Sequence, residues 1–276
     1  MVCLLPLVLS FAFTTAGIID SNCPNRQSIE ASLKKVHIPG ATIVVVNASH
    51  ILYEQAFGYH SLSPIQPMDV KKSIFTLASI SKTFVGVAVM QLVEKELVDL
   101  DTDINQYLSE PHQRIYHPQY PSHSITLRRL LSHSASIAVT SQALQTYFQP
   151  NDIALTQNTL ANTCFTYLNP NNTSNWLPKP PGSVAFYSNE GSSLAALVVE
   201  RITKMPYDQY VKENILKPLN IDIRQAGVRL TDFENKDELV KHYVYASNES
   251  FVQGWNQAMS QLTITEISVN ISIYSL

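Results

Sequence analysis

Cysteine, glycine and charge are all scarce in this sequence, and each shortage excludes a class of protein. Three cysteines without Cys-x-x-Cys spacing, in 276 residues, exclude a zinc ribbon and a disulfide-dense miniature scaffold. The eight glycines form neither a Gly-x-Ser-x-Gly elbow nor a Gly-x-x-x-x-Gly-Lys phosphate loop, two common hydrolase and nucleotide signatures. Only 15% of residues are charged, the net charge is −3, and basic residues cluster only as doublets, which argues against a nucleic-acid partner.

What the chain does contain is enough apolar material for a packed core. Hydrophobic residues make up 45% of the sequence, so wholesale disorder is excluded, and the length suits one or two domains. The eight histidines show no metal-ligand spacing, and we expect no metal site.

The N-terminus indicates a secreted protein. An apolar stretch ends in small residues before Gly17, so residues 1–16 are predicted to be a signal peptide cleaved after Ala16, with the protein domain over 24–276. An uncleaved signal anchor is the alternative, because no charged residue precedes Asp20. Cleavage leaves two cysteines, Cys23 and Cys164, which either pair in an oxidising compartment or remain free thiols.

Asn-x-Ser/Thr triplets fit the same compartment, although such triplets also arise by chance. Asn47 lies beside an apolar run, which predicts poor access for a glycosylating enzyme. The candidate glycosylation sites are Asn47, Asn171, Asn172, Asn248 and Asn270.

The order of elements favours an α+β fold. A helix over 28–36 is followed by strands over 41–46 and 51–57, joined by a four-residue hairpin loop. Helices are then predicted over 79–97, 125–131, 191–204 and 207–216. The helix over 79–97 is apolar on most sides, which predicts that it is buried in the core.

The start of that helix carries a Ser-x-x-Lys motif, Ser79 to Lys82. A serine in the first turn lies near unpaired backbone N–H groups, and a lysine three residues later can reach its hydroxyl. Lysine must be neutral to accept a proton, which costs about 4.6 kcal/mol at pH 7 for an ordinary pKa. The bare pattern is weak, because Ser32 to Lys35 has the same spacing on an amphipathic helix.

A second motif, Tyr-x-Asn, also occurs twice. Tyr187 to Asn189 opens a predicted helix, whereas Tyr167 to Asn169 runs into a proline-rich loop. The first is therefore the better candidate.

The flanking sequences make the set specific. Phe-Thr-Leu-Ala-Ser-Ile-Ser-Lys-Thr-Phe surrounds Ser79, Ile-Thr-Leu-Arg-Arg-Leu-Leu-Ser-His-Ser ends at Ser134, and Pro-Gly-Ser-Val-Ala-Phe-Tyr-Ser-Asn-Glu-Gly surrounds Tyr187. In this order they closely resemble the serine β-lactamase and penicillin-binding-protein superfamily, in its class-C-like branch, from about Ile38 to Ile221.

The resemblance implies a β-lactamase/transpeptidase-like fold, an antiparallel sheet with a mostly helical subdomain. It implies that Ser79 is the acyl-forming nucleophile, whose own N–H is one oxyanion donor, and that Lys82 activates it. Tyr187 would carry the proton to the leaving group, and Asn189 would bind the substrate. It implies no cofactor and a small-molecule or peptide substrate: a β-lactam, a D-amino-acid peptide, as for D-alanyl-D-alanine carboxypeptidases, or an ester.

Two departures leave catalysis by this chain open. The family's Thr-Ser-Gly after the histidine is Ser134-Ala135-Ser136 here, and its third motif, Lys/His-Thr/Ser-Gly, is absent. We therefore expect an incomplete sheet with Val44, Val46 and Leu52 poorly covered, and self-association through its exposed edge. A catalytically inactive, truncated relative and a secreted binding module are the alternatives.

Overall fold

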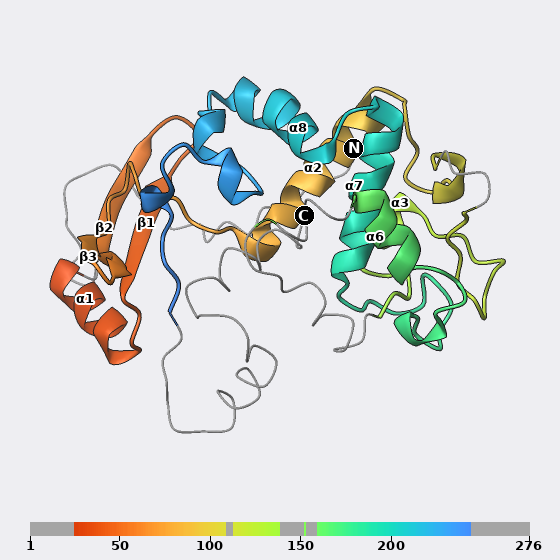
Figure 1. Ribbon diagram of the computed structural model, residues 1–276, viewed down its shortest axis with the longest axis horizontal. Coiled ribbons are helices and arrows are strands. Elements are labelled where there is room, and N and C mark those ends of the chain that lie inside the picture. Colours follow the sequence, from red (N-terminus) through yellow and green to blue (C-terminus); the bar gives the residue numbers. More distant parts are fainter. Residues whose placement is uncertain (1–24, 109–112, 139–151, 153–158, 244–276) are drawn as a thin grey trace.

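The computed structural model describes residues 25–108, 113–138, 152 and 159–243. A small antiparallel sheet and a helical subdomain lie at opposite ends of the molecule, joined by the segment that leads into α2 and by the chain after α8 (Figure 1). The α+β class expected from the sequence is confirmed. The helices are α1 (Arg26–Lys35), α2 (Lys82–Glu94), α3 (Leu127–Leu131), α6 (Leu160–Tyr167), α7 (Asn189–Thr203) and α8 (Tyr207–Val211).

Short helical turns connect these elements. One π-helical turn, Lys212–Leu216, extends α8. The 3-10 turns are Ala78–Ser81, Ile104–Gln106, Thr173–Asn175, Lys217–Leu219, Ile223–Gln225, Leu230–Asp232 and Lys236–Glu238.

Three strands form the sheet in the described residues: β1 (Gly40–Val46), β2 (Ile51–Leu62) and β3 (Ile65–Pro67), in that order. The β1–β2 hairpin is confirmed, with Gly40 opposite Gly58 and a register shift near its loop. β2 runs five residues further than expected because Gly58 allows the strand to bend there: its φ is +64°, and an added Cβ would lie 2.2 Å from the Pro39 carbonyl oxygen. The sequence did not reveal β3.

The hairpin end of the sheet is bare, as the sequence predicted. Val44, Val46 and Leu52 are 50%, 62% and 55% exposed. Because neighbouring strand residues point to opposite faces, the exposure of Val45 beside Val44 and Val46 means that both faces are uncovered.

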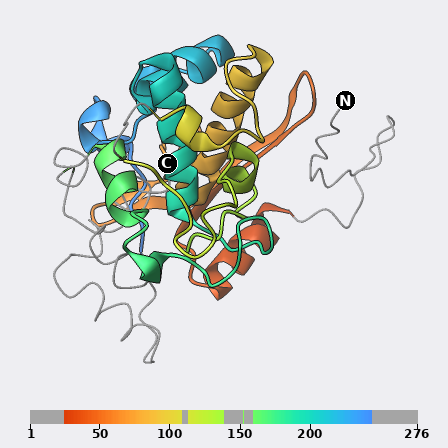
Figure 2. The same cartoon turned by 90° about the vertical axis from the view of Figure 1, so that its right-hand side faces the viewer.

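Helix α7 forms the centre of the helical subdomain and packs against α2, α3, α6 and α8 (Figure 2). Every residue from Glu190 to Val199 is buried. Ser188 caps the helix by accepting a hydrogen bond from Gly191 N at 3.0 Å, and Lys204 ends it in a left-handed conformation.

The expectation for 79–97 is only partly right. Residues 78–81 form a 3-10 turn, and α2 ends at Glu94 rather than at Leu97. One face is buried, through Val85, Ala88, Val89 and Leu92, because α7 and α8 cover that side. Val87 and Met90 on the other side are 44% and 46% exposed, so the helix is not buried all round.

Cys164 is a free thiol buried in α6, and this burial raises its pKa. Cys23, its predicted partner in a disulfide, lies outside the described residues. The disulfide therefore stays a prediction, and the free thiol of Cys164 does not support it. Among the described residues, no helix is both long and apolar enough to cross a membrane. The predicted signal peptide, residues 1–16, lies outside them.

Candidate active site

The turn before α2 presents Ser79 to solvent. Ala78, the first residue of the 3-10 turn, adopts a φ of +46°, and the turn leads directly into α2, whose first residue is Lys82. Ser79 is exposed, while Lys82 is half-buried at the base of the turn. A left-handed residue immediately before Ser79 is the kind of local strain that collects at functional sites.

Three polar groups meet at this turn. Ser79 Oγ lies 2.5 Å from the Tyr187 hydroxyl, across 108 residues of sequence, and Lys82 Nζ donates to Ser79 Oγ at 3.3 Å. Lys82 Nζ also lies 5.0 Å from the centre of the Tyr187 ring, a cation–π arrangement. The Ser79 hydroxyl thus touches two groups that can exchange protons with it.

The second copies of the two motifs, which begin at Ser32 and Tyr167, are not part of this site. The Ser32 hydroxyl donates to the Ser28 carbonyl oxygen of its own exposed helix at 2.8 Å. Tyr167 is the last residue of α6, and its carbonyl oxygen accepts a hydrogen bond from Asn175. Position in the fold therefore separates each motif from its copy.

His133 holds Tyr187 in place, a role that the sequence reading missed. Its ring lies 4.7 Å from the Tyr187 ring, its carbonyl oxygen accepts from Phe186 N at 2.7 Å, and its Nδ1 accepts from Ser188 N at 3.3 Å. Burial, and secondly the positive charge of Lys82, lower the pKa of His133, which favours the neutral ring that can accept this bond. The flank ending at Ser134, which contains His133 and contributes to the family resemblance, was the signal that could have identified it.

Asn189 stands at the first position of α7, close to the tyrosine in sequence. Its Oδ1 is buried and has no hydrogen-bond partner among the described residues. An unpaired buried acceptor is costly, so this oxygen is an unsatisfied polar atom at the start of α7. No hydrogen bond between Asn189 and Ser79, Lys82 or Tyr187 is present in the described part of the chain.

Ser136 stands in the turn after His133, where the resemblance led us to expect a glycine. Ser136 has a φ of +60°, a left-handed conformation that glycine adopts without strain. It is 1% exposed, and its hydroxyl has no hydrogen-bond partner in the described residues. Ser136 therefore adopts the left-handed conformation expected of the glycine in the resembling motif.

One side of the site is open. Tyr187 is 52% exposed, and within the described residues no strand lies beside Ser79 with the third motif expected from the resemblance. Among the same residues, no group of three or more His, Cys, Asp or Glu side chains is placed to hold a metal ion.

Three of the candidate glycosylation sites fall within the described residues. Asn47, Asn171 and Asn172 are all exposed, so the expectation of poor access at Asn47 was wrong: its side chain folds back over the hairpin loop, where its Oδ1 accepts from Ser49 N and His50 N. Asn248 and Asn270 lie outside the described residues.

Comparison with known proteins identifies the family and supports the fold. Residues 25–248 match the Beta-lactamase family model, and the chain belongs to that family. It is 26% identical over 231 residues to penicillin-binding protein 4* of Bacillus subtilis, covering 82% of this chain and 47% of the relative, and 28% identical over 234 residues to protein flp of Staphylococcus aureus strain N315, covering 83% and 42%. The chain therefore spans less than half the length of these relatives.

Solved structures show the same fold. The octameric penicillin-binding protein homologue from Pyrococcus abyssi aligns with a TM-score of 0.65 at 22% identity, over 81% of this chain and 48% of that one. A class C β-lactamase aligns with a TM-score of 0.57 at 18% identity, over 89% and 66%. The β-lactamase/transpeptidase-like fold is thereby confirmed.

Proposed function

We propose that this chain is a serine hydrolase that forms an acyl-enzyme on Ser79. The observation that carries the proposal is the meeting of Ser79 Oγ with the Tyr187 hydroxyl at 2.5 Å and with Lys82 Nζ at 3.3 Å. A nucleophile within hydrogen-bond reach of a base, itself held by a third group, is the arrangement that nucleophilic catalysis requires. Here His133 is the group that holds the tyrosine.

Ser79, Lys82 and Tyr187 can carry out every proton transfer that the reaction needs. Ser79 Oγ bonds to the substrate carbonyl carbon while its proton passes to the Lys82–Tyr187 pair. The Tyr187 hydroxyl, the closer of the two, then delivers a proton to the leaving nitrogen or oxygen as the scissile bond breaks. In the second step, water attacks the carbonyl carbon of the acyl-enzyme ester and gives a proton to the Lys82–Tyr187 pair. The pair returns a proton to Ser79 Oγ as the ester bond breaks.

The proposed substrates are small amides or esters, including β-lactams and D-amino-acid peptides. Structures aligned with this chain include EstCE1, a hydrolase with promiscuous acyltransferase activity, and a D-amino acid amidase from Ochrobactrum anthropi, with TM-scores of 0.64 and 0.63. Asn189 is the proposed substrate-binding amide, supported by its position at the start of α7, two residues after Tyr187. The exposed position of Ser79 is compatible with substrates of varied shape.

Covalent labelling tests the proposal. The purified chain is treated with a fluorophosphonate or a penicillin, and the labelled residue is located by peptide mass mapping. We expect one adduct, on Ser79, which Ser79→Ala removes and Ser32→Ala leaves unchanged. Labelling at Ser32, or equally at many serines, contradicts the assignment.

A catalytically inactive acyl acceptor is the second candidate, and the open side of the site favours it. A missing oxyanion donor typically slows acyl transfer about a hundred- to a thousand-fold. Steady hydrolysis of nitrocefin or 4-nitrophenyl acetate that Ser79→Ala abolishes identifies a hydrolase. A single stoichiometric burst identifies an acceptor that fails to turn over.

We also propose secretion, supported by the apolar segment over 1–16 and by the exposed sequons at Asn47, Asn171 and Asn172. Expression in cultured animal cells, with the medium and the cell pellet analysed separately, tests it. A protein in the medium that begins at residue 17 and shifts in mobility after glycosidase treatment supports cleavage. A glycosylated protein that stays in the membrane fraction supports the anchor instead.

A further inference from the structure

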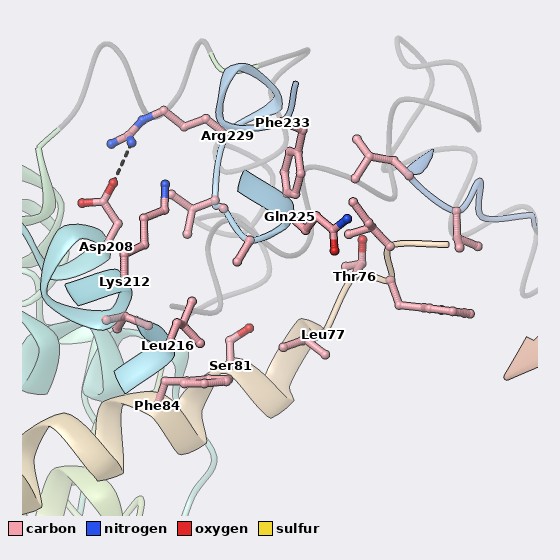
Figure 3. Close-up of a pocket in the computed structure, with 18 of the residues that line it drawn as sticks. Thr76, Leu77, Ser81, Phe84, Asp208, Lys212, Leu216, Gln225, Arg229 and Phe233 are labelled. Carbon is pink, nitrogen blue, oxygen red and sulfur yellow. Dashed lines mark hydrogen bonds and ion pairs between the residues drawn. The ribbon is translucent and has the colours of Figure 1, made fainter. Parts of the chain in front are cut away.

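A hollow beside the 3-10 turn Ala78–Ser81 has a lining that is separate from the proposed catalytic group. It has a volume of about 430 Å³, within the range of small-molecule pockets, and opens between the start of α2, the α8 extension and the loop over 225–233 (Figure 3). Apolar side chains form most of its wall, among them Leu77, Phe84, Leu216 and Phe233. Ser79, Lys82, Tyr187 and Asn189 do not line it.

Two polar groups in this wall lack hydrogen-bond partners. Ser81 is 7% exposed, its hydroxyl points into the hollow (Figure 3), and no partner for it is present in the described residues. The side chain of Lys212 is only 22% exposed, and its Nζ lies 3.6 Å from Asp232 Oδ2, too far for a good hydrogen bond. Both side chains line the hollow, so each can donate a hydrogen bond to a bound molecule.

The charge around the hollow favours an anion. Its lining includes Lys71, Lys72, Lys212 and Arg229 but a single carboxylate, Asp208. That carboxylate is already engaged, because Arg229 donates to it at 2.7 Å (Figure 3). Arg229 is thus held by a short ion pair, whereas Lys212 has only the longer one, at 3.6 Å to Asp232 Oδ2.

Asp232, the ion-pair partner of Lys212, has hydrogen-bond donors other than the lysine. Its Oδ2 accepts from Val228 N at 2.8 Å and from Arg229 N at 3.0 Å. These bonds hold the 228–232 turn, so the ammonium can shift toward an incoming ligand without leaving the carboxylate unpaired.

We propose that this hollow binds an amphipathic carboxylate, with its apolar body against Leu77, Phe84 and Phe233 and its carboxylate on Lys212. Ser81 supplies a second donor inside the hollow. The proposal does not depend on acylation at Ser79, because no member of the catalytic group lines the hollow.

Calorimetric titration with decanoate tests it, using 1-decanol as the uncharged control. We expect Ser79→Ala to bind decanoate as the parent does, and decanol to bind at least about tenfold more weakly. Lys212→Met should weaken decanoate binding about tenfold, the scale of one charge-assisted hydrogen bond. The matched control is Lys217→Met, since Lys217 pairs with Glu213 at 2.5 Å and does not line the hollow.

Two further variants locate the bound molecule. Val228→Trp should fill the hollow and abolish binding; if circular dichroism shows that this variant is unfolded, Ser81→Ala, which should weaken binding several-fold, takes its place. Undetectable binding by the parent, equal binding of decanol, equal affinities for Lys212→Met and Lys217→Met, or loss of binding in Ser79→Ala would each overturn the proposal.

Discussion

Replacing Ser136 by glycine should stabilise the protein. The residue has a φ of +60° and is 1% exposed, and its hydroxyl has no hydrogen-bond partner in the described residues. Relief of the left-handed strain is worth about 1–2 kcal/mol, and removal of the unpaired buried hydroxyl about 1–3 kcal/mol. Glycine's greater freedom in the unfolded chain returns about 0.5–1 kcal/mol. The net gain in unfolding free energy is therefore about 1–4 kcal/mol.

Thermal unfolding followed by circular dichroism measures the effect. In a chain of this size each kcal/mol moves Tm by about 2–4 °C, so Ser136→Gly should raise Tm by at least about 2 °C. Ser136→Ala should give a smaller rise, because it removes the hydroxyl but keeps the strained Cβ.

Ser134→Gly is the matched control in the same turn. Ser134 lacks a positive φ, and its hydroxyl lies 2.9 Å from the Ser132 hydroxyl. The substitution removes this bond and relieves no strain, so Tm should fall. A Ser136→Gly protein that melts at or below the parent temperature would refute the account of this turn.

Three other predictions follow from the site and the sheet. Lys82→Ala should cut Ser79 labelling about a hundredfold or more while the circular dichroism spectrum is kept, and Tyr187→Phe should slow it by a similar factor; parent-like rates would mean that these contacts are structural. Because burial and Lys82 lower the pKa of His133, the unfolded chain binds its proton first, so Tm should fall as pH drops below about 6.5, and His133→Phe should reduce that dependence; a flat profile would contradict this. The bare hairpin should make the protein self-associate in sedimentation, and the double variant Val46→Lys, Ile51→Lys should be more monomeric; a parent that is a stable monomer would contradict this.

The elements that depend on neighbouring residues were the part of the fold that the sequence predicted well. The hairpin loop over 47–50, the helix that opens after Ser188 and the first helix all follow from short-range signals, namely the loop length between two apolar runs and helical spacing. The pairing of Ser79 with Tyr187 needed more than such signals, because 108 residues separate them. Only the ordered flanks, read as a resemblance, brought the two together.

Features set by tertiary packing escaped the sequence reading. β3 has three residues and ends in Pro67, which gives no alternating pattern to detect. The exposed side of α2 depends on which helices cover it, and its apolar Val87 and Met90 look like core residues in sequence. The role of His133 arises from backbone bonds to Phe186 and Ser188, which no local pattern encodes.

The arrangement also separates the proposed chemistry from substrate choice. Ser79 and Lys82 stand on one turn at the start of α2, while Tyr187 is fixed by His133 and by the cap of α7, and α2 packs on α7 inside the buried core. None of these contacts involves β1, β2 or β3. The reacting groups can therefore keep their geometry although the sheet end of the molecule is bare. Binding selectivity needs walls on both sides of a substrate. The described residues build only the wall formed by the helices. We therefore expect weak substrate selectivity together with specific labelling at Ser79.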